Sequence, residues 1–548
     1  PTHISTDKNK IKKIHSNYKL TEGISDNIFS KTINEALNNL PKLNEWLSSD
    51  ILKKFDNVSW NEAIINLHKP KKNEDKKKYI NRLIFDEILS TFLINSNLKK
   101  NFKRKTKFPK KVNFNLTNEL EEKIGFKLTN DQINAINEIN NDISSDKRMF
   151  RILQGDVGSG KTVVSLITSQ NVVLNNYQVA FMAPTEILAK QHYNLYKKIF
   201  SNSKTVDLLT GKTEYKKRKN ILKKLENNKI NIIFGTHALF QDKIKFKNLG
   251  LIIVDEQHKF GVNQRKKLSE KGNSNCDVLV MSATPIPRTM MMTLYGDMDI
   301  TLIKSKPKNR KEILTYTKSI DKINDVINFV KKEIKNNNQV FWVCPLIEES
   351  KKVDQQSSIE RFEYLTKFFK DQVGIIYGTI DKDDKEKILD KFLHNQIKVL
   401  VSTTVIEVGI DFPNATCIII EDSNKFGLSQ LHQLRGRVGR GTKQSTCILL
   451  FKSTLSKNAR KRLKILKSSN DGFFIAEEDL KLRGYGDLLG FQQSGQKTFR
   501  LADPIINEDL FKLAEDEIKN IENNNINLSK YNLLLKLYDK ANIVNELI

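Results

Sequence analysis

Apolar residues recur with two different periods along this chain. Between residues 25 and 100 they follow the spacing of helices, as in NRLIFDEILSTFLI, and strand-like runs are scarce. From about residue 126, amphipathic helical stretches alternate with short apolar runs such as MFRILQ, QVAFMAP and LGLIIVDE. Because strands that are separated by helices build parallel sheets from βαβ units, this pattern predicts an α/β fold.

A second series of short apolar runs begins after residue 312, and the chain returns to a helical pattern from about residue 455. No segment repeats at a fixed period, so the prediction of two similar lobes rests on the order of the elements. We predict a first lobe over residues 113–305 and a second lobe over residues 306–454, each a parallel sheet flanked by helices. Residues 1–112 are predicted to form a helical segment, and residues 455–548 a C-terminal helical region.

The chain is strongly basic. Its 92 Lys and Arg residues outnumber its 64 Asp and Glu residues, which gives a net charge of +28. Such a surplus attracts polyanions, and nucleic acid is the obvious candidate, although lysine is abundant throughout and part of the surplus is compositional. One run, NFKRKTKFPKKV at residues 101–112, holds six basic residues and by itself is typical of a solvated linker.

The four cysteines are far apart and form no CxxC pair, so neither a disulfide framework nor a zinc site is indicated. That usage fits a reducing cytoplasm. No apolar run approaches the roughly 18 residues that span a bilayer, and the N-terminus lacks the apolar stretch of a signal peptide. We therefore expect a cytoplasmic protein with no membrane partner. Because the chain begins with Pro1 and not with Met, we also expect that a preceding segment is missing.

The stretch LQGDVGSGKTVVS carries the most specific chemical signal. Residues 155–162 fit the pattern GxxxxGK[ST], and they stand after an apolar strand and before a helix. Glycines let the backbone amides point at phosphate oxygens, helped by the positive end of the helix. Lysine at this position reaches the β- and γ-phosphates, and the threonine hydroxyl holds Mg²⁺. The predicted nucleotide-binding residues of this loop are Gly155, Gly158, Ser159, Gly160, Lys161 and Thr162.

Two adjacent carboxylates, Asp255 and Glu256, follow the apolar strand LGLIIV. By themselves they fit a polar loop at a strand end as well as they fit a site. In a P-loop fold, however, the acid after a later strand binds Mg²⁺ through water, and its neighbour orients or deprotonates the attacking water. The sequence therefore predicts that Asp255 binds the metal and that Glu256 is the base in hydrolysis of the γ-phosphate.

A set of ordered motifs makes the chain similar to the superfamily 2 helicases and, among them, to the RecG family of branched-DNA helicases. The matching motifs are LTNDQ, APTEILAKQH, GTHALF, DEQH and SATP, followed by FWVCPLIEES, STTVIEVGIDFPNA and QLHQLRGRVGRG. The tail SSNDGFFIAEEDLKLRGYGDLLGFQQSG resembles the hairpin and loop by which this family couples ATP hydrolysis to movement on duplex DNA. The resemblance covers nearly the whole chain and implies two tandem RecA-like P-loop lobes.

The resemblance also implies roles for single residues. Arg437 and Arg440 would be arginine fingers that reach the γ-phosphate, a task suited to a guanidinium that keeps its charge. Gln132 would read adenine, and Asp411 would lie near the ribose. The residues expected to couple nucleotide to DNA are His258, Ser282 and Thr284, and those expected to act in translocation are Arg483 and Gln493. A structural histidine is the alternative for His258, and a surface loop without an energetic role is the alternative for the last two.

What the resemblance implies as a whole is an ATP- and Mg²⁺-dependent translocase on double-stranded DNA that remodels stalled forks and Holliday junctions. Branched and double-stranded DNA and single-stranded DNA-binding protein are its expected partners, and it is expected to be a nucleoid-associated monomer of the bacterial cytoplasm. RecG proteins also carry an N-terminal wedge domain, which this chain is expected to lack. Two alternatives stay open: an RNA helicase, because the motor motifs alone do not separate RNA from DNA, and a basic DNA-binding fragment without motor activity.

Overall fold

The structure of this chain is a computed structural model that divides into two compact units. The first unit comprises residues 1–100, 288–297 and 484–548, and the second comprises residues 101–287 and 298–483. The structure describes residues 16, 18, 23, 25–70, 76–104, 106–200, 205–241, 244–256, 276–287, 290–291, 296, 298–307, 310–345, 351–403, 412–439, 441, 443–452, 454–483, 499–524 and 526–538.

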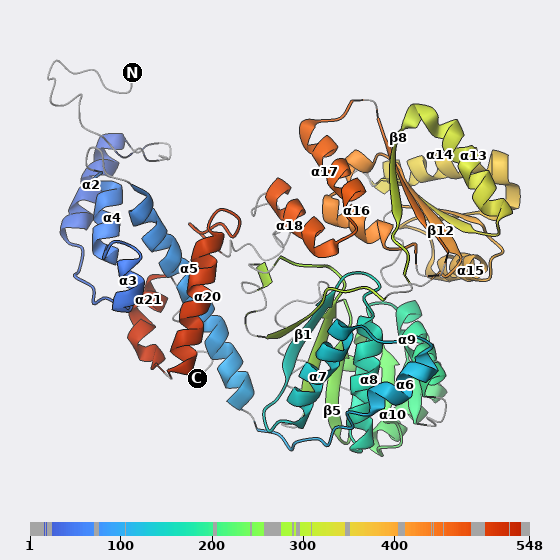
Figure 1. The fold of residues 1–548 in the computed structure, drawn as a ribbon, viewed down its shortest axis with the longest axis horizontal. Coiled ribbons are helices and arrows are strands. Elements are labelled where there is room, and N and C mark those ends of the chain that lie inside the picture. Colours follow the sequence, from blue (N-terminus) through green and yellow to red (C-terminus); the bar gives the residue numbers. More distant parts are fainter. Residues whose placement is uncertain are drawn as a thin grey trace. The chain divides into compact units, whose positions relative to one another are not determined.

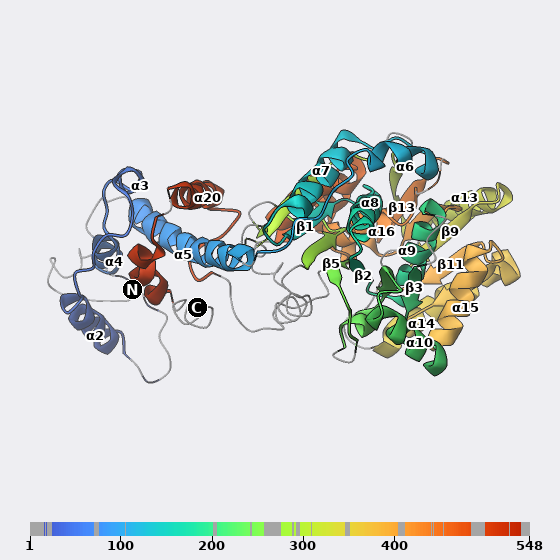
Figure 2. The same cartoon turned by 90° about the horizontal axis from the view of Figure 1, so that it is seen from below.

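The first unit is helical and contains helices from both the N-terminal and the C-terminal parts of the chain (Figure 1). Its helices are α2 (Asp26–Asn38), α3 (Ser49–Lys53), α4 (Trp60–His68), α5 (Lys76–Arg104), α20 (Glu508–Asn523) and α21 (Asn532–Leu537). Helix α5 runs as one continuous rod of 29 residues (Figure 2). The C-terminal segment is bonded to this rod: Ser96 donates to the Glu522 carboxylate at 2.5 Å, and the Tyr538 hydroxyl donates to the Leu83 carbonyl at 2.9 Å.

The second unit contains two sheets, and the first of them has seven parallel strands in the order β3-β4-β2-β5-β6-β1-β7. These strands are β1 (Phe150–Gly155), β2 (Gln178–Met182), β3 (Val206–Leu209), β4 (Ile232–Gly235), β5 (Leu249–Val254), β6 (Asp277–Ser282) and β7 (Asp299–Ile303). The helices of this lobe are α6 (Leu116–Ile124), α7 (Asn130–Ser144), α8 (Lys161–Leu174), α9 (Glu186–Ile199) and α10 (Tyr215–Glu226). Strand β1 therefore lies between β6 and β7, and β5 lies between β2 and β6.

The second sheet has six parallel strands in the order β10-β11-β9-β12-β13-β8. They are β8 (Leu314–Ser319), β9 (Gln339–Val343), β10 (Val373–Ile376), β11 (Val399–Ser402), β12 (Ala415–Ile420) and β13 (Thr446–Phe451). The helices are α13 (Ile323–Lys335), α14 (Lys351–Phe369), α15 (Lys382–Leu393), α16 (Leu428–Arg435), α17 (Lys457–Ser468) and α18 (Gly472–Arg483).

Both faces of the second sheet are buried, which explains its continuous apolar runs. Successive residues of β9 alternate between two separate apolar clusters: Phe341 and Val343 belong to one, and Val340 and Trp342 belong to the other. Because side chains alternate across a strand, each cluster lies on one face of the sheet. Helices must therefore cover both faces, as the βαβ pattern of the sequence predicts.

The predicted fold class is confirmed, since two parallel sheets of seven and six strands follow one another with helices around them. The bounds of the four predicted domains stay predictions. Within the described residues, no helix combines the length and the apolar character that crossing a membrane requires.

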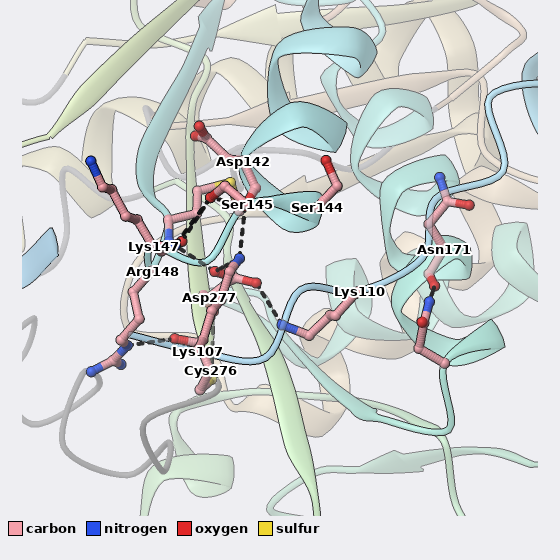
Figure 3. A network of polar contacts seen from close by, with 12 residues as sticks. Lys107, Lys110, Asp142, Ser144, Ser145, Lys147, Arg148, Asn171, Cys276 and Asp277 are labelled. Atoms are coloured by element: carbon pink, nitrogen blue, oxygen red, sulfur yellow. Dashed lines mark hydrogen bonds and ion pairs between the residues drawn. The ribbon is translucent and has the colours of Figure 1, made fainter. Parts of the chain in front are cut away.

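The interpretation of the basic run as a solvated linker is wrong for two of its lysines. Lys107 and Lys110 are 5% and 1% exposed, and their ammonium groups lie 2.6 and 2.7 Å from the two carboxylate oxygens of Asp277 (Figure 3). Asp277 also accepts the backbone N–H of Met149 at 2.8 Å, at the start of β1. Buried ammonium groups need such a partner, so this segment is fixed to the amino ends of β1 and β6.

Candidate active site

A cavity of about 1110 Å³ lies beside the carboxyl ends of β1 and β5. It is lined by Lys161 and Thr162 from the P-loop, by Asp255 and Glu256 after β5, and by Arg437 from the second lobe. The carboxyl edge of a parallel sheet is where open α/β folds place their ligands. Lys161 and Arg437, which are 276 positions apart in the sequence, thus line one cavity.

Two glycines of the P-loop are required by its backbone conformation and by the close approach of neighbouring side chains. Gly158 and Gly160 have φ angles of +76° and +87°, in the left-handed region that glycine adopts without strain. A Cβ at Gly160 would lie 2.1 Å from Nε2 of Gln132, and one at Gly158 would lie 1.4 Å from Nη1 of Arg310. Side chains at these two positions would therefore displace the groups that pack on the loop.

Lys161 is the first residue of α8, and its side chain folds back over the loop that precedes it. Its Nζ donates to the carbonyl oxygens of Gly155 at 2.7 Å and Asp156 at 2.9 Å. The side chain is largely buried and still lines the cavity. The ammonium group is thus held at the mouth of the loop, where the sequence pattern predicts phosphate oxygens.

Gln132 joins the P-loop to the start of α7. Its Oε1 accepts the backbone N–H of Thr129 at 2.8 Å, which completes a capping box, and its Nε2 donates to the carbonyl of Ser159 at 2.8 Å. The residue is fully buried. These bonds occupy both ends of the amide, and adenine reading by Gln132 stays a prediction.

Asp255 is oriented by a histidine that the sequence analysis assigned no role. Its Oδ2 lies 2.9 Å from Nε2 of His192 on α9, and its Oδ1 accepts the backbone N–H of Glu256 at 3.0 Å. Its own N–H donates to the Met182 carbonyl at the end of β2. The carboxylate predicted to bind the metal is therefore fixed by two neighbouring strands and one helix.

Glu256 is held in an unusual conformation. Its φ of +54° lies in the left-handed region, which costs a residue with a Cβ about 1–3 kcal/mol. Burial and the neighbouring Asp255 charge raise the pKa of its carboxyl group to about 7, against the opposing effects of Lys161 and Arg437. A carboxyl group that titrates near neutral pH suits a general base.

Ser282 and Thr284 lie next to the P-loop strand. Their hydroxyl oxygens are 3.0 Å apart, and Nε2 of Gln154 in β1 donates to the Thr284 carbonyl at 3.1 Å. The end of β6 is thereby tied to β1, one residue before the P-loop begins. This position suits the coupling role that the resemblance implies, which stays a prediction.

Several predicted residues cannot be placed in this site. His258, Asp411, Arg440 and Gln493 lie outside the described residues, as does the side chain of Arg483. Arg437 is described, is 5% exposed and lines the cavity.

Sequence reasoning missed a buried polar cluster behind the P-loop. The carboxylate of Asp156 is 2.7 Å from Nε2 of His432 and 2.6 Å from Nζ of Lys306. Burial alone would raise its pKa, but these two partners hold the pKa well below its usual range. Arg310 also bridges the lobes, since it donates to the carbonyls of Val157 at 2.7 Å and Gly439 at 2.9 Å. Asp156 and His432 both lie inside recognised motifs, but nothing in their spacing indicates that they meet.

Comparison with known proteins places the two lobes and the tail in three families. Residues 129–293 match the DEAD/DEAH box helicases, and residues 319–442 match the helicase conserved C-terminal domain. Residues 469–541 match the C-terminal part of domain 3 of the ATP-dependent DNA helicase RecG. The chain is 41% identical over 526 residues to the ATP-dependent DNA helicase RecG of Thermotoga maritima, covering 94% of this chain and 67% of the relative.

This chain belongs to the RecG family of ATP-dependent DNA helicases. It is also 40% identical over 515 residues to RecG of Bacillus subtilis, covering 93% of this chain and 75% of that relative. A solved structure of RecG bound to a three-way DNA junction is similar with a TM-score of 0.71 and 38% identity, over 92% of this chain and 67% of that one. As a RecG family member the chain is an ATP-hydrolysing enzyme of the helicase class.

Proposed function

We propose that this chain is an ATP-driven motor that moves along double-stranded DNA and acts on branched DNA. The observation that carries the proposal is the cavity that brings Lys161, Glu256 and Arg437 together. The family match of the tail at residues 469–541 supports coupling of that chemistry to DNA. The RecG structure bound to a three-way junction supports branched DNA as the substrate.

The chemistry begins when ATP enters the cavity. The Lys161 ammonium group would exchange its two carbonyl partners for oxygens of the β- and γ-phosphates, which are stronger acceptors. Glu256 would take a proton from the attacking water as the water oxygen bonds to the γ-phosphorus. The bond from that phosphorus to the bridging oxygen breaks, and ADP leaves. Arg437, with Arg440, would neutralise charge that develops on the phosphoryl oxygens.

Thr162 and Asp255 supply the hard oxygen donors that Mg²⁺ prefers. Within the described part of the chain, no three His, Cys, Asp or Glu side chains form a metal-binding group. A metal that takes most of its ligands from phosphate and water needs no such group. When bound, Mg²⁺ would neutralise charge on the β- and γ-phosphate oxygens.

The remaining roles are proposed from the resemblance. Gln132 and Asp411 would contact the adenosine part of ATP, and His258, Ser282 and Thr284 would couple the nucleotide to DNA. Arg483 and Gln493 would act in translocation. The net charge of +28 supports a polyanionic partner.

Steady-state ATP hydrolysis tests this proposal. The rate is measured with a three-way junction, a linear duplex of equal length, single-stranded DNA and duplex RNA, and Lys161→Ala serves as the blank. We expect both duplex DNA substrates to stimulate the parent chain above single-stranded DNA and RNA, because family members act on DNA.

Two outcomes would contradict the proposal. Stimulation by duplex RNA above duplex DNA would favour an RNA helicase. Binding of DNA without turnover above the Lys161→Ala blank would indicate a DNA-binding fragment without motor activity.

A further inference from the structure

Asp156 connects the P-loop to the second lobe through its side chain. Its backbone carbonyl accepts the Lys161 ammonium group at 2.9 Å, so Asp156 is in direct contact with the residue proposed to bind phosphate. Asp156 is only 2% exposed. Its carboxylate contacts His432 and Lys306. One residue thus faces both the nucleotide site and the polar cluster behind it.

The hydrogen bonds of His432 have a fixed direction. Its Nδ1 lies 2.8 Å from Nη2 of Arg435, and a guanidinium group can only donate. Nδ1 must therefore accept, and the proton of the neutral ring is on Nε2, which donates to Asp156 at 2.7 Å. Burial lowers the pKa of His432, in agreement with a neutral ring. The direction of donation runs from Arg435 through His432 to Asp156.

The other end of this chain of hydrogen bonds lies on the C-terminal helices. Nη1 of Arg435 donates to the carbonyls of Leu466 at 2.6 Å and Ser469 at 2.9 Å, at the end of α17. The last carbonyls of a helix have no partner within the helix, so Arg435 caps this end. Lys306 makes a second connection, because its Nζ contacts Asp156 and donates to the carbonyl of Asn470 at 2.9 Å.

Gly472, the first residue of α18, touches the same pair. A Cβ at this position would lie 2.8 Å from Oδ1 of Asp156 and 2.8 Å from Nε2 of His432. The turn between α17 and α18 therefore rests directly on the P-loop carboxylate. Three independent contacts, through Arg435, Lys306 and Gly472, join this turn to the nucleotide site.

We propose that Asp156 and His432 are positioning residues that transmit the nucleotide state of the P-loop to the turn between α17 and α18. The inference rests on the proposed function and deepens it. When the Lys161 ammonium group leaves the Asp156 carbonyl for phosphate, the backbone that holds the Asp156 carboxylate loses one restraint. A buried polar network passes on such a change because its hydrogen-bonded members cannot relax independently.

Hydrogen exchange with and without a non-hydrolysable ATP analogue and Mg²⁺ tests the inference on the parent chain. Peptides over residues 150–165 report on the P-loop, and peptides over residues 464–476 report on the turn. We expect the analogue to change exchange in both peptides. In His432→Leu, only the P-loop peptide should respond, because leucine can neither accept from Arg435 nor donate to Asp156.

His432→Gln is the matched conservative variant. Its amide can accept from Arg435 with the oxygen and donate to Asp156 with the nitrogen, so the turn should respond as it does in the parent chain. A response of the turn in His432→Leu that equals the parent response would overturn the inference. So would loss of the response in both variants, since a merely structural role of the ring would explain it.

A kinetic measurement on the turn is independent of His432. Gly472→Ala should lower the DNA-stimulated kcat by about 2- to 30-fold and leave the KM for ATP near the parent value, because the turn is displaced while the phosphate site stays intact. Gly378→Ala is the matched control, since a Cβ there meets no atom within 4 Å. An unchanged kcat in Gly472→Ala, or an equal loss in Gly378→Ala, would overturn the inference.

Failure of the inference is distinguishable from failure of the proposed function. If the P-loop peptide of the parent chain responds to the analogue and the turn does not, nucleotide binding stands and the transmission is overturned. If neither peptide responds, the proposed nucleotide site itself is contradicted and the inference falls with it.

Discussion

At the residue scale, the carboxyl groups of Asp255 and Glu256 have different surroundings although the two residues are adjacent in sequence. His192 and a backbone amide fix the carboxylate of Asp255. Glu256 is buried, has a left-handed backbone and carries a carboxyl group whose pKa is raised to about 7. Two carboxyl groups with different environments can take different roles, here metal binding and proton abstraction.

Replacing the proposed base tests its role. We expect Glu256→Gln to lower kcat by about 10²- to 10⁴-fold, the usual contribution of a positioned general base, and to leave ATP binding near the parent value. Single-turnover hydrolysis and nucleotide titration measure the two quantities. Glu226→Gln, at the exposed end of α10, is the matched control and should behave as the parent does. Normal turnover in Glu256→Gln would remove Glu256 from the mechanism.

The raised pKa of Glu256 sets the expected pH dependence. A base must be deprotonated to act, so kcat/KM for ATP should fall as the pH is lowered through about 7 and level off above it. The profile is measured between about pH 5.5 and 8.5, and the residual activity of Glu256→Gln should lack this inflection. A parent profile that stays flat over the whole of this pH range would contradict the assignment.

The sequence could predict those site residues that lie inside recognised motifs. The P-loop spacing placed Lys161 and Thr162, and the acids after an apolar run placed Asp255 and Glu256. The contacts of His192 with Asp255, and of His432 and Lys306 with Asp156, were not predictable. His192 and His432 lie inside recognised motifs, but the motifs do not indicate which groups they meet. Their contacts depend on which strands and lobes meet, and no local pattern encodes this.

At the element scale, sequence patterns predicted strand identity but not strand order. Apolar runs such as LGLIIV indicate strands that are buried on both faces, and such strands belong to parallel sheets. The position of β1 between β6 and β7 depends on packing between segments more than 100 residues apart. The basic run at residues 101–112 was wrongly interpreted as a solvated linker for the same reason. The carboxylate that binds Lys110 belongs to Asp277, 167 residues farther along the chain.

The segment around Lys107 and Lys110 gives a prediction about stability. Removing the shared partner by Asp277→Ala leaves two ammonium groups buried, which should lower the local stability of β1 and β6 by about 3–5 kcal/mol. Hydrogen exchange of the amides in these strands measures the change. Asp384→Ala removes an exposed ion pair with Lys387 and should lower the stability much less, because water screens exposed charges. Equal effects of the two substitutions would show that the buried pairs contribute little.

At the scale of the whole molecule, the net charge of +28 predicts salt-sensitive binding of DNA. A protein that neutralises about six to ten phosphates loses about 10³- to 10⁵-fold in affinity between about 50 and 200 mM salt. We expect duplex binding by this chain to fall log-linearly in this range, measured by fluorescence anisotropy. Lys161→Ala should show the same slope, because ATP chemistry is not involved. A flat dependence would show that the surplus lysines do not face DNA.

Displacement of a triplex-forming strand from duplex DNA is the measurement that tests the central claim most directly, because only a motor that moves along duplex DNA removes this strand. We predict that the parent chain displaces the strand when ATP and Mg²⁺ are present, and that Lys161→Ala and Glu256→Gln do not. Two results would contradict the claim that hydrolysis in this cavity drives movement on DNA. One is that the parent chain hydrolyses ATP without displacing the strand, and the other is that Lys161→Ala displaces it.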